Sequence, residues 1–115
     1  MEKKLFIIDS YPTDKTINQI GDQLSSLNPD QFDVSIFLLD YGVFWLLDES
    51  WDLLFRKNVF YYANAHDAEK YSIPFRDEVV FSGMPALRQL LNTSENVTRL
   101  EEERIFPEPL LTDKS

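Results

Sequence analysis

The fold of this 115-residue chain is decided by the stretch VSIFLLDYGVFWLLDESWDLLF, residues 34–55. Its first six residues are apolar except for Ser35, and the run stops at Asp40. A short run that is apolar almost throughout, rather than at every second position, is typical of a strand buried on both faces of a parallel sheet. Residues 34–39 are therefore predicted to form an interior strand, with Asp40 at its carboxyl end.

Three further runs of the same kind occur, at residues 5–8, 59–63 and 79–81. Helical patterns separate the runs. Between the first two, apolar residues from Ile17 to Leu27 repeat at spacings of three and four, as on one face of an amphipathic helix. After the last run, Ser82 is expected to cap a helix whose first turn contains Pro85. This alternation predicts a three-layer α/β/α domain with a mainly parallel sheet of about four to five strands.

The composition changes near residue 92. We predict that residues 1–91 form a single α/β domain, and that residues 92–115 form an acidic, partly ordered tail with two prolines. Within that tail, residues 99–106 are compatible with either a helical turn or an edge strand.

The net charge of −9 and the absence of cysteine exclude several classes of function. An acidic surface repels nucleic acids and acidic membranes, and it favours either solubility or attraction to a basic partner. Without cysteine the chain has no disulfide, thiolate metal site or thiol nucleophile. The apolar run at residues 5–8 is too short for a signal peptide, and no run is long enough to span a membrane, so we expect a cytoplasmic protein.

Polar residues follow the predicted strands, at the edge where parallel sheets bind ligands. This strand-end rim comprises Asp9, Ser10, Asp40, Tyr41, Asn64, His66, Ser82 and Gly83, and all of these except Tyr41 are candidate ligand-binding residues. Its aspartates are suitable ligands for Mg²⁺, and a neighbouring carboxylate can orient His66 as a general base. The same residue types also cap helices and form turns, so both interpretations remain open. No catalytic residue, metal ligand or cofactor is assigned. A small-ligand or metal-assisted enzyme using Asp9, Asp40 and His66 is the alternative function.

Residues 43–55 are apolar on more than one helical face, which a surface helix of a monomer does not require. The acidic sequence Asp48-Glu49-Ser50 predicts a break between two short pieces, at residues 43–47 and 50–57. The apolar excess indicates either burial in the core or contact with another subunit. The expected contact residues are Phe44, Trp45, Leu47, Trp51 and Phe55.

Three segments resemble the DsrE/DsrF/DsrH-like proteins, small α/β domains of bacterial and archaeal sulfur relay. They are DYGV at residues 40–43, NVFYYANAHDAEKYSI at residues 58–73 and RDEVVFSGMPALRQLL at residues 76–91. The resemblance covers residues 4–91 and implies a DsrE-like fold. It also implies assembly as a homo-oligomer, or as a hetero-oligomer with related subunits, with the segment after the second strand near the subunit contacts. That implication favours the interface interpretation of residues 43–55.

The chain departs from this family at two positions. Catalytic members carry a persulfide on a cysteine near the end of the third strand, where this chain has Ala63-Asn64-Ala65. Direct persulfide transfer by this polypeptide is therefore excluded. Tyr41 also separates Asp40 from Gly42, where the family has Asp-Gly-Val. The resemblance thus implies a non-catalytic subunit that acts through protein–protein contacts. The acidic charge and the lack of a long apolar run predict no nucleic-acid or membrane partner.

Overall fold

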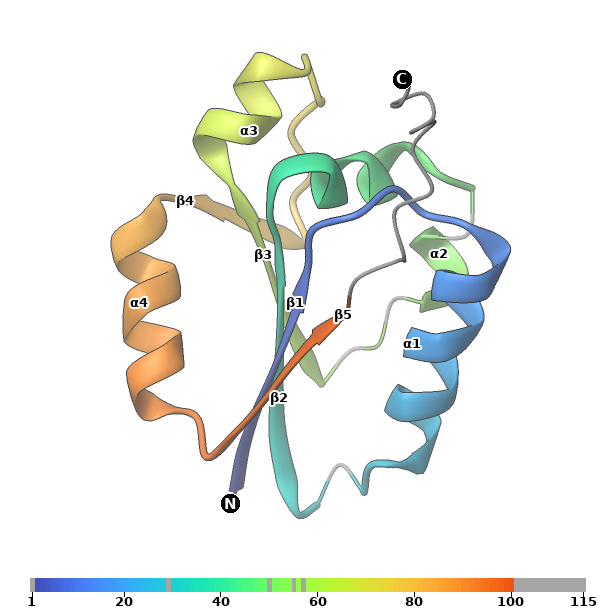
Figure 1. Cartoon of the computed structure of the whole chain (residues 1–115), viewed down its shortest axis with the longest axis vertical. Helices are drawn as coiled ribbons and strands as arrows, with labels where there is room; N and C mark the ends of the chain where they lie inside the picture. The colour runs from blue at the N-terminus through green and yellow to red at the C-terminus, as the bar shows by residue number, and fades with distance from the viewer. Residues whose placement is uncertain (1, 29, 50, 55, 57, 101–115) are drawn as a thin grey trace, which may run out of the picture.

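The computed structural model describes residues 2–28, 30–49, 51–54, 56 and 58–100. Within them the chain forms a five-stranded sheet in the order β4-β3-β2-β1-β5 (Figure 1). The strands are β1 (Glu2–Ile8), β2 (Phe32–Leu38), β3 (Val59–Asn64), β4 (Val79–Ser82) and β5 (Asn96–Leu100). Every neighbouring pair runs parallel. The predicted α/β fold with a parallel sheet is confirmed.

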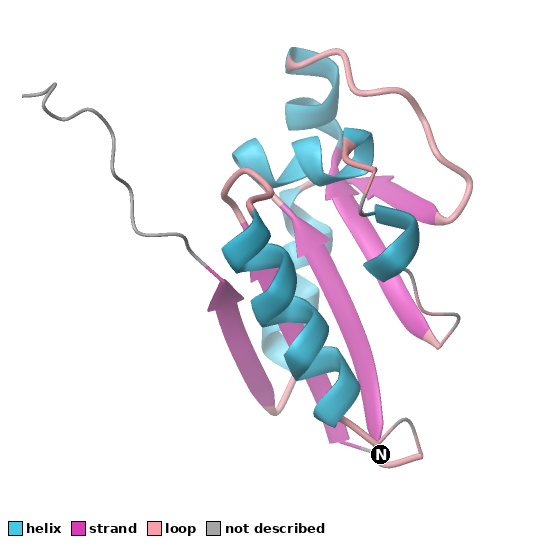
Figure 2. Cartoon of the chain, turned by 90° about the vertical axis from the view of Figure 1, so that its right-hand side faces the viewer, coloured by secondary structure: helices cyan, strands magenta, loops and turns pink. Residues whose placement is uncertain are grey.

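Helices cover both faces of the sheet. Helices α1 (Asp14–Ser26) and α2 (Trp51–Leu54) lie on one face, and α4 (Met84–Thr93) lies on the other (Figures 1 and 2). The start of α1 is fixed by a capping box, in which the Thr13 side chain accepts a hydrogen bond from the Thr16 backbone N–H and the Thr16 hydroxyl accepts one from the Thr13 N–H. These bonds satisfy amide groups that a helix start otherwise leaves without partners.

The two helical layers create two apolar cores. Phe6 and Ile8 of β1 belong to the larger core, together with Ile20 of α1. Leu5 and Ile7 point to the opposite face and pack in a smaller core with Leu87 of α4. Successive side chains of a strand point to opposite faces, so a strand covered on both sides needs apolar residues at every position. This requirement explains the continuous apolar runs.

The order of the strands explains why α4 stands apart from the other helices. From β1 to β4 each new strand is added on the same side of the sheet, and the β4–β5 connection then returns across the sheet to β1. A right-handed crossover in the opposite direction places its helix on the opposite face. All parallel strands nevertheless end at the same edge, near η1 (Asp40–Leu47) and α3 (Ala65–Lys70) in Figure 1.

Gly42 allows η1, a 3₁₀ helix, to cross directly over the end of β1. A Cβ atom at this position would lie 1.9 Å from the carbonyl oxygen of Ile8, so no side chain fits there. The η1 helix stops at Leu47, and the backbone N–H of Asp48 bonds to the Trp45 carbonyl oxygen. The first predicted piece, residues 43–47, is thus part of a longer helix. Of the second piece, residues 51–54 form α2, and residues 50, 55 and 57 lie outside the described residues.

The domain continues past the boundary predicted at residue 91. Helix α4 extends to Thr93, and β5 pairs in register with β1, so that Lys4 opposes Asn96 and Ile8 opposes Leu100. The assignment of residues 92–100 to a tail is therefore corrected, because they form the end of a helix and an edge strand. No helix in the described part of the chain has the length and apolarity needed to cross a membrane.

Candidate functional site

Strand carboxyl ends bring the predicted rim residues to one edge of the sheet. Asp9 and Ser10 follow β1, Asp40 begins η1 after β2, and Asn64 ends β3. Ser82 ends β4 and Gly83 precedes α4, while His66 lies in the first turn of α3 with an exposed side chain. The contacts of each side chain show whether it caps a helix, pairs with another residue or is able to bind a ligand.

Asp9 forms an ion pair with the edge strand. Its side chain is only 6% exposed, and its Oδ2 accepts hydrogen bonds from Nε of Arg99, at 3.0 Å, and from Nη2 of the same residue. The other carboxylate oxygen of Asp9 and the hydroxyl of Ser10 are buried and have no hydrogen-bond partner among the described residues. The backbone oxygen of Ser10 accepts a bond of 2.7 Å from Nε1 of Trp45. Asp9 and Ser10 therefore connect the end of β1 to β5 and η1.

Asp40 makes no side-chain cap at the start of η1. The residue before it, Leu39, is the N-cap, and Asp40 itself has a left-handed φ of 54°. Its backbone N–H donates to Oδ2 of Asp67 at 2.7 Å, and its Oδ1 accepts a bond of 3.4 Å from the hydroxyl of Tyr71. The structure thus links Asp40 to α3 and to the residue that follows α3.

Asn64 and Gly83 are the rim residues that occupy helix N-cap positions. The Oδ1 atom of Asn64 accepts from the Asp67 backbone N–H at 3.0 Å and caps α3. Gly83, and not Ser82 as the sequence predicted, is the N-cap of α4, and it has no side chain with which to cap. The Ser82 hydroxyl is buried without a described partner. Strand β4 therefore ends one residue later than predicted, at Ser82, and α4 begins after Gly83.

Asp9 contacts Arg99, whereas Asp40 contacts Asp67 and Tyr71. Within the described part of the chain, no interaction joins Asp9, Asp40 and His66 to one another. Among the described residues, no group of three or more His, Cys, Asp and Glu side chains is arranged to hold a metal ion.

Four aromatic rings form a continuous cluster at the rim, here called the aromatic rim cluster. It comprises Tyr11, Tyr41, Phe44 and Tyr71. The rings of Tyr11 and Tyr41 stack, with centroids 4.7 Å apart and planes 12° apart. The ring centroid of Phe44 lies 5.0 Å from that of Tyr11 and 4.9 Å from that of Tyr71. Because Tyr41 also contacts Tyr71, each ring of the cluster contacts two others. Tyr11 is 46% exposed.

Sequence analysis assigned Tyr41 to the candidate rim and Phe44 to the candidate interface, and it assigned neither Tyr11 nor Tyr71. The three tyrosines come from three separate connections: Tyr11 follows β1, Tyr41 lies in η1, and Tyr71 follows α3. Nothing in the chain order indicates that they meet. The available signal was the position of Tyr11 and Tyr41 directly after the polar residues that end two neighbouring parallel strands.

The electrostatic environment of the aromatic rim cluster includes the carboxylate of Asp40 and the ammonium group of Lys70. Partial burial raises the pKa of the Tyr71 hydroxyl, Lys70 opposes this shift, and Asp40 and Tyr41 add to it. The Nζ atom of Lys70 lies 5.2 Å from the Tyr71 ring centroid, which is a cation–π contact. Tyr71 therefore remains a protonated hydrogen-bond donor to Asp40 at neutral pH.

The expected contact residues divide between the core and the surface. Trp45 and Trp51 are only 1% and 2% exposed and belong to the larger core of this chain, so their side chains are not available to a partner. Phe44 is partly buried, and Leu47 is 53% exposed. Phe55 lies outside the described residues. The extra apolar face of residues 43–55 is explained in part by burial, because η1 and α2 close the end of the core.

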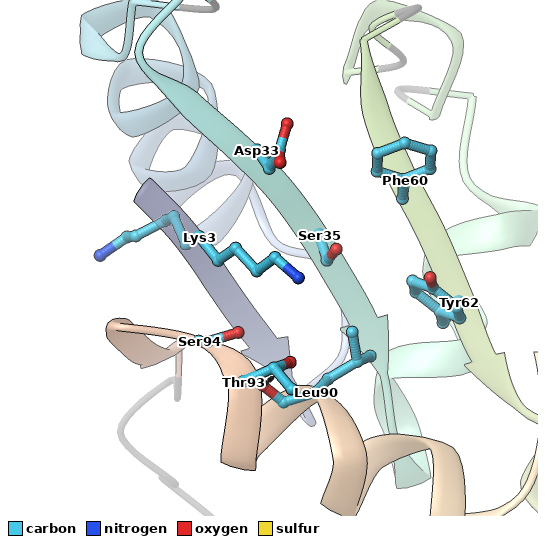
Figure 3. A pocket seen from close by; sticks show the side chains of 9 residues that line it. Lys3, Asp33, Ser35, Phe60, Tyr62, Leu90, Thr93 and Ser94 are labelled. Carbon is cyan, nitrogen blue, oxygen red and sulfur yellow. Dashed lines mark hydrogen bonds between the residues drawn. The ribbon is translucent and has the colours of Figure 1, made fainter. Parts of the chain in front are cut away.

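A shallow groove of about 180 Å³ lies away from the rim, beside α4. Figure 3 shows Lys3, Ser35, Tyr62 and Leu90 among the side chains around it. The groove also includes Phe60 and the end of α4 at Thr93 and Ser94. None of the predicted rim residues lines this groove.

Comparison with known proteins gives a likeness of fold. No protein-family model matches the chain, and no curated protein matches it. Among solved structures, the chain is similar to the YchN protein from E. coli, with a TM-score of 0.67 and 16% sequence identity over 86% of this chain and 99% of that chain. At this identity the likeness shows the fold alone, and the fold is that of a DsrE-like domain.

Proposed function

We propose that this chain is a non-catalytic DsrE-like subunit that acts through protein–protein contacts in sulfur relay. The observation that carries the proposal is a DsrE-like fold in a chain that contains no cysteine. A protein of this architecture without a thiol has no sulfur nucleophile with which to form a persulfide. Its contribution to a relay is then to bind and position other subunits.

An exposed apolar residue at the end of η1 supports this proposal. Leu47 presents a large apolar side chain to solvent at the end of η1, with partly buried Phe44 in the same helix. Subunit interfaces are enriched in aromatic side chains, and their cores are more apolar than the rest of the surface. We propose that Leu47 lies in the contact with a second subunit, either a copy of this chain or a related cysteine-bearing subunit.

Light scattering of the purified protein tests this proposal over a range of concentrations, alone and mixed with a cysteine-bearing DsrE-like protein. The wild type is expected to form an oligomer in at least one of these samples, and Leu47→Asp is expected to shift it toward the monomer. The matched control is Leu91→Asp, which places the same charge at an exposed leucine of α4. A wild-type protein that remains monomeric in every sample contradicts the proposal.

A further inference from the structure

The backbone next to the aromatic rim cluster is strained at two points. Asp40 and Ser72 have φ angles of 54° and 57°, and they are the non-glycine residues with positive φ in the described part of the chain. Each stands directly beside a tyrosine of the cluster, Tyr41 and Tyr71 respectively. Strained residues persist where surrounding contacts hold them, and they are frequent at ligand clamps. Here the strain accompanies the positioning of two rings.

The cluster combines ring faces with carboxylates. Asp40 accepts a bond from Tyr71, and Asp67 accepts one from the backbone of Asp40, so two carboxylates lie on the Tyr71 side of the cluster. The face of an aromatic ring attracts cations, and Lys70 already uses the Tyr71 ring in this way. At the other end of the cluster, the exposed Tyr11 ring has no cation–π contact with a described residue. The exposed Tyr11 ring is therefore a candidate to receive a cation in the way that the Tyr71 ring receives Lys70.

We propose that the aromatic rim cluster docks an arginine-bearing segment of a partner protein, with a guanidinium stacked on Tyr11 and attracted to Asp40 and Asp67. Arginine fits better than lysine, because its planar and weakly hydrated guanidinium stacks on the face of an aromatic ring. The net charge of −9 steers a basic segment toward this chain. The inference rests on the proposed function only in requiring a protein partner, and it uses a different surface from Leu47.

The binding test uses a short fluorescein-labelled peptide of alternating arginine and glycine. Two matched peptides replace arginine by lysine or by citrulline, which keeps the shape of arginine without its charge. Fluorescence anisotropy with the full chain is expected to give the tightest binding for the arginine peptide and no measurable binding for the citrulline peptide. Added salt is expected to weaken the binding. Equal binding of the arginine and citrulline peptides would overturn the proposal.

Substitutions locate the binding. Tyr11→Leu keeps an apolar side chain but removes the ring, and it is expected to weaken arginine binding about 2- to 5-fold. Its control is Phe60→Leu, an exposed aromatic residue on β3 outside the cluster. Asp40→Asn keeps an acceptor for Tyr71 and tolerates a positive φ, and it is expected to weaken binding as well. Its control is Asp33→Asn on β2, which removes the same charge about 20 Å away along the strand.

Other outcomes count against the proposal. If the controls weaken binding as much as the cluster variants, the attraction comes from the overall charge and the docking site does not exist. If free guanidinium binds as tightly as the peptide, the cluster is a small-molecule site. If Tyr11→Leu dissociates an oligomer of the wild-type chain, the cluster contacts a second copy. Because Leu47→Asp is measured separately by light scattering, the proposed subunit function and this docking site can fail independently.

Discussion

The carboxylate of Glu78 accepts a hydrogen bond of 2.8 Å from the indole nitrogen of Trp51, 27 residues earlier in the chain. The same Oε2 atom forms an ion pair of 2.8 Å with Nε of Arg76. This contact ties α2 to the segment that leads into β4. Partial burial opposes ionisation of Glu78, but hydrogen bonds from Trp51 and from its own backbone N–H, together with the charge of Arg76, hold its pKa below the ordinary value of 4.5.

Glu78→Gln is expected to lower the free energy of unfolding by about 0.5–1 kcal/mol at neutral pH, because the amide keeps an acceptor for Trp51 but loses the charge. A lowered native pKa stabilises the fold above pH 4.5, and this contribution is lost as the pH falls through the native pKa. Urea unfolding across this range should therefore show the wild type converging on the variant. A constant difference at acidic pH would count against the assignment. Glu69→Gln, at an exposed position, provides the control.

Gly42→Ala is expected to destabilise the fold by about 3 kcal/mol or more, because its Cβ would lie 1.9 Å from a backbone oxygen of Ile8. Gly83→Ala provides the matched control. There a Cβ meets no atom closer than the Pro85 side chain, at 3.4 Å. The loss of an N-cap glycine is expected to cost less than about 1 kcal/mol. Denaturant unfolding of the two variants measures the difference. Similar stabilities would show that η1 does not need its close approach to β1.

Arg99→Ala is expected to cost about 1–3 kcal/mol, because it leaves the buried carboxylate of Asp9 without its ion pair. The backbone amides of β5 should then exchange hydrogen faster, since the pair joins this edge strand to the end of β1. Adding Asp9→Asn to Arg99→Ala removes the stranded charge and should restore part of the stability. If the two substitutions are simply additive, the ion pair does not hold β5 in place.

Trp45→Phe is expected to lower stability by about 2–4 kcal/mol. The change removes buried volume and leaves the Ser10 carbonyl oxygen without the indole N–H that lies 2.7 Å from it. Leu47→Ala, two residues later and exposed, should change stability by less than about 0.5 kcal/mol. Thermal unfolding of both variants compares them. A Trp45→Phe variant as stable as the wild type would show that the indole and its hydrogen bond do not stabilise the larger core.

The regular elements were readable from the sequence where one local rule dominated. The runs at residues 5–8, 59–63 and 79–81 lie in strands, and the run at residues 34–39 does so up to Leu38, because a strand covered on both faces shows itself as an uninterrupted apolar run. The helix start at Gly83 was missed by one residue, since Ser82 has the better capping side chain but is held in β4 by pairing with Asn64. Strand β5 was anticipated only at Arg99 and Leu100, where an edge strand was one of two alternatives, because Val97 and its polar neighbours carry no continuous apolar signal.

The sequence alone therefore determined the class of fold, the absence of thiol chemistry and the polar character of the rim, because these depend on composition and on local periodicity. Tertiary structure decided which side chains meet. It buried Trp45 and Trp51, paired Asp9 with Arg99, and brought Tyr11, Tyr41 and Tyr71 together. Such contacts join residues far apart in the chain, and they depend on strand order and crossover direction, which no local pattern encodes.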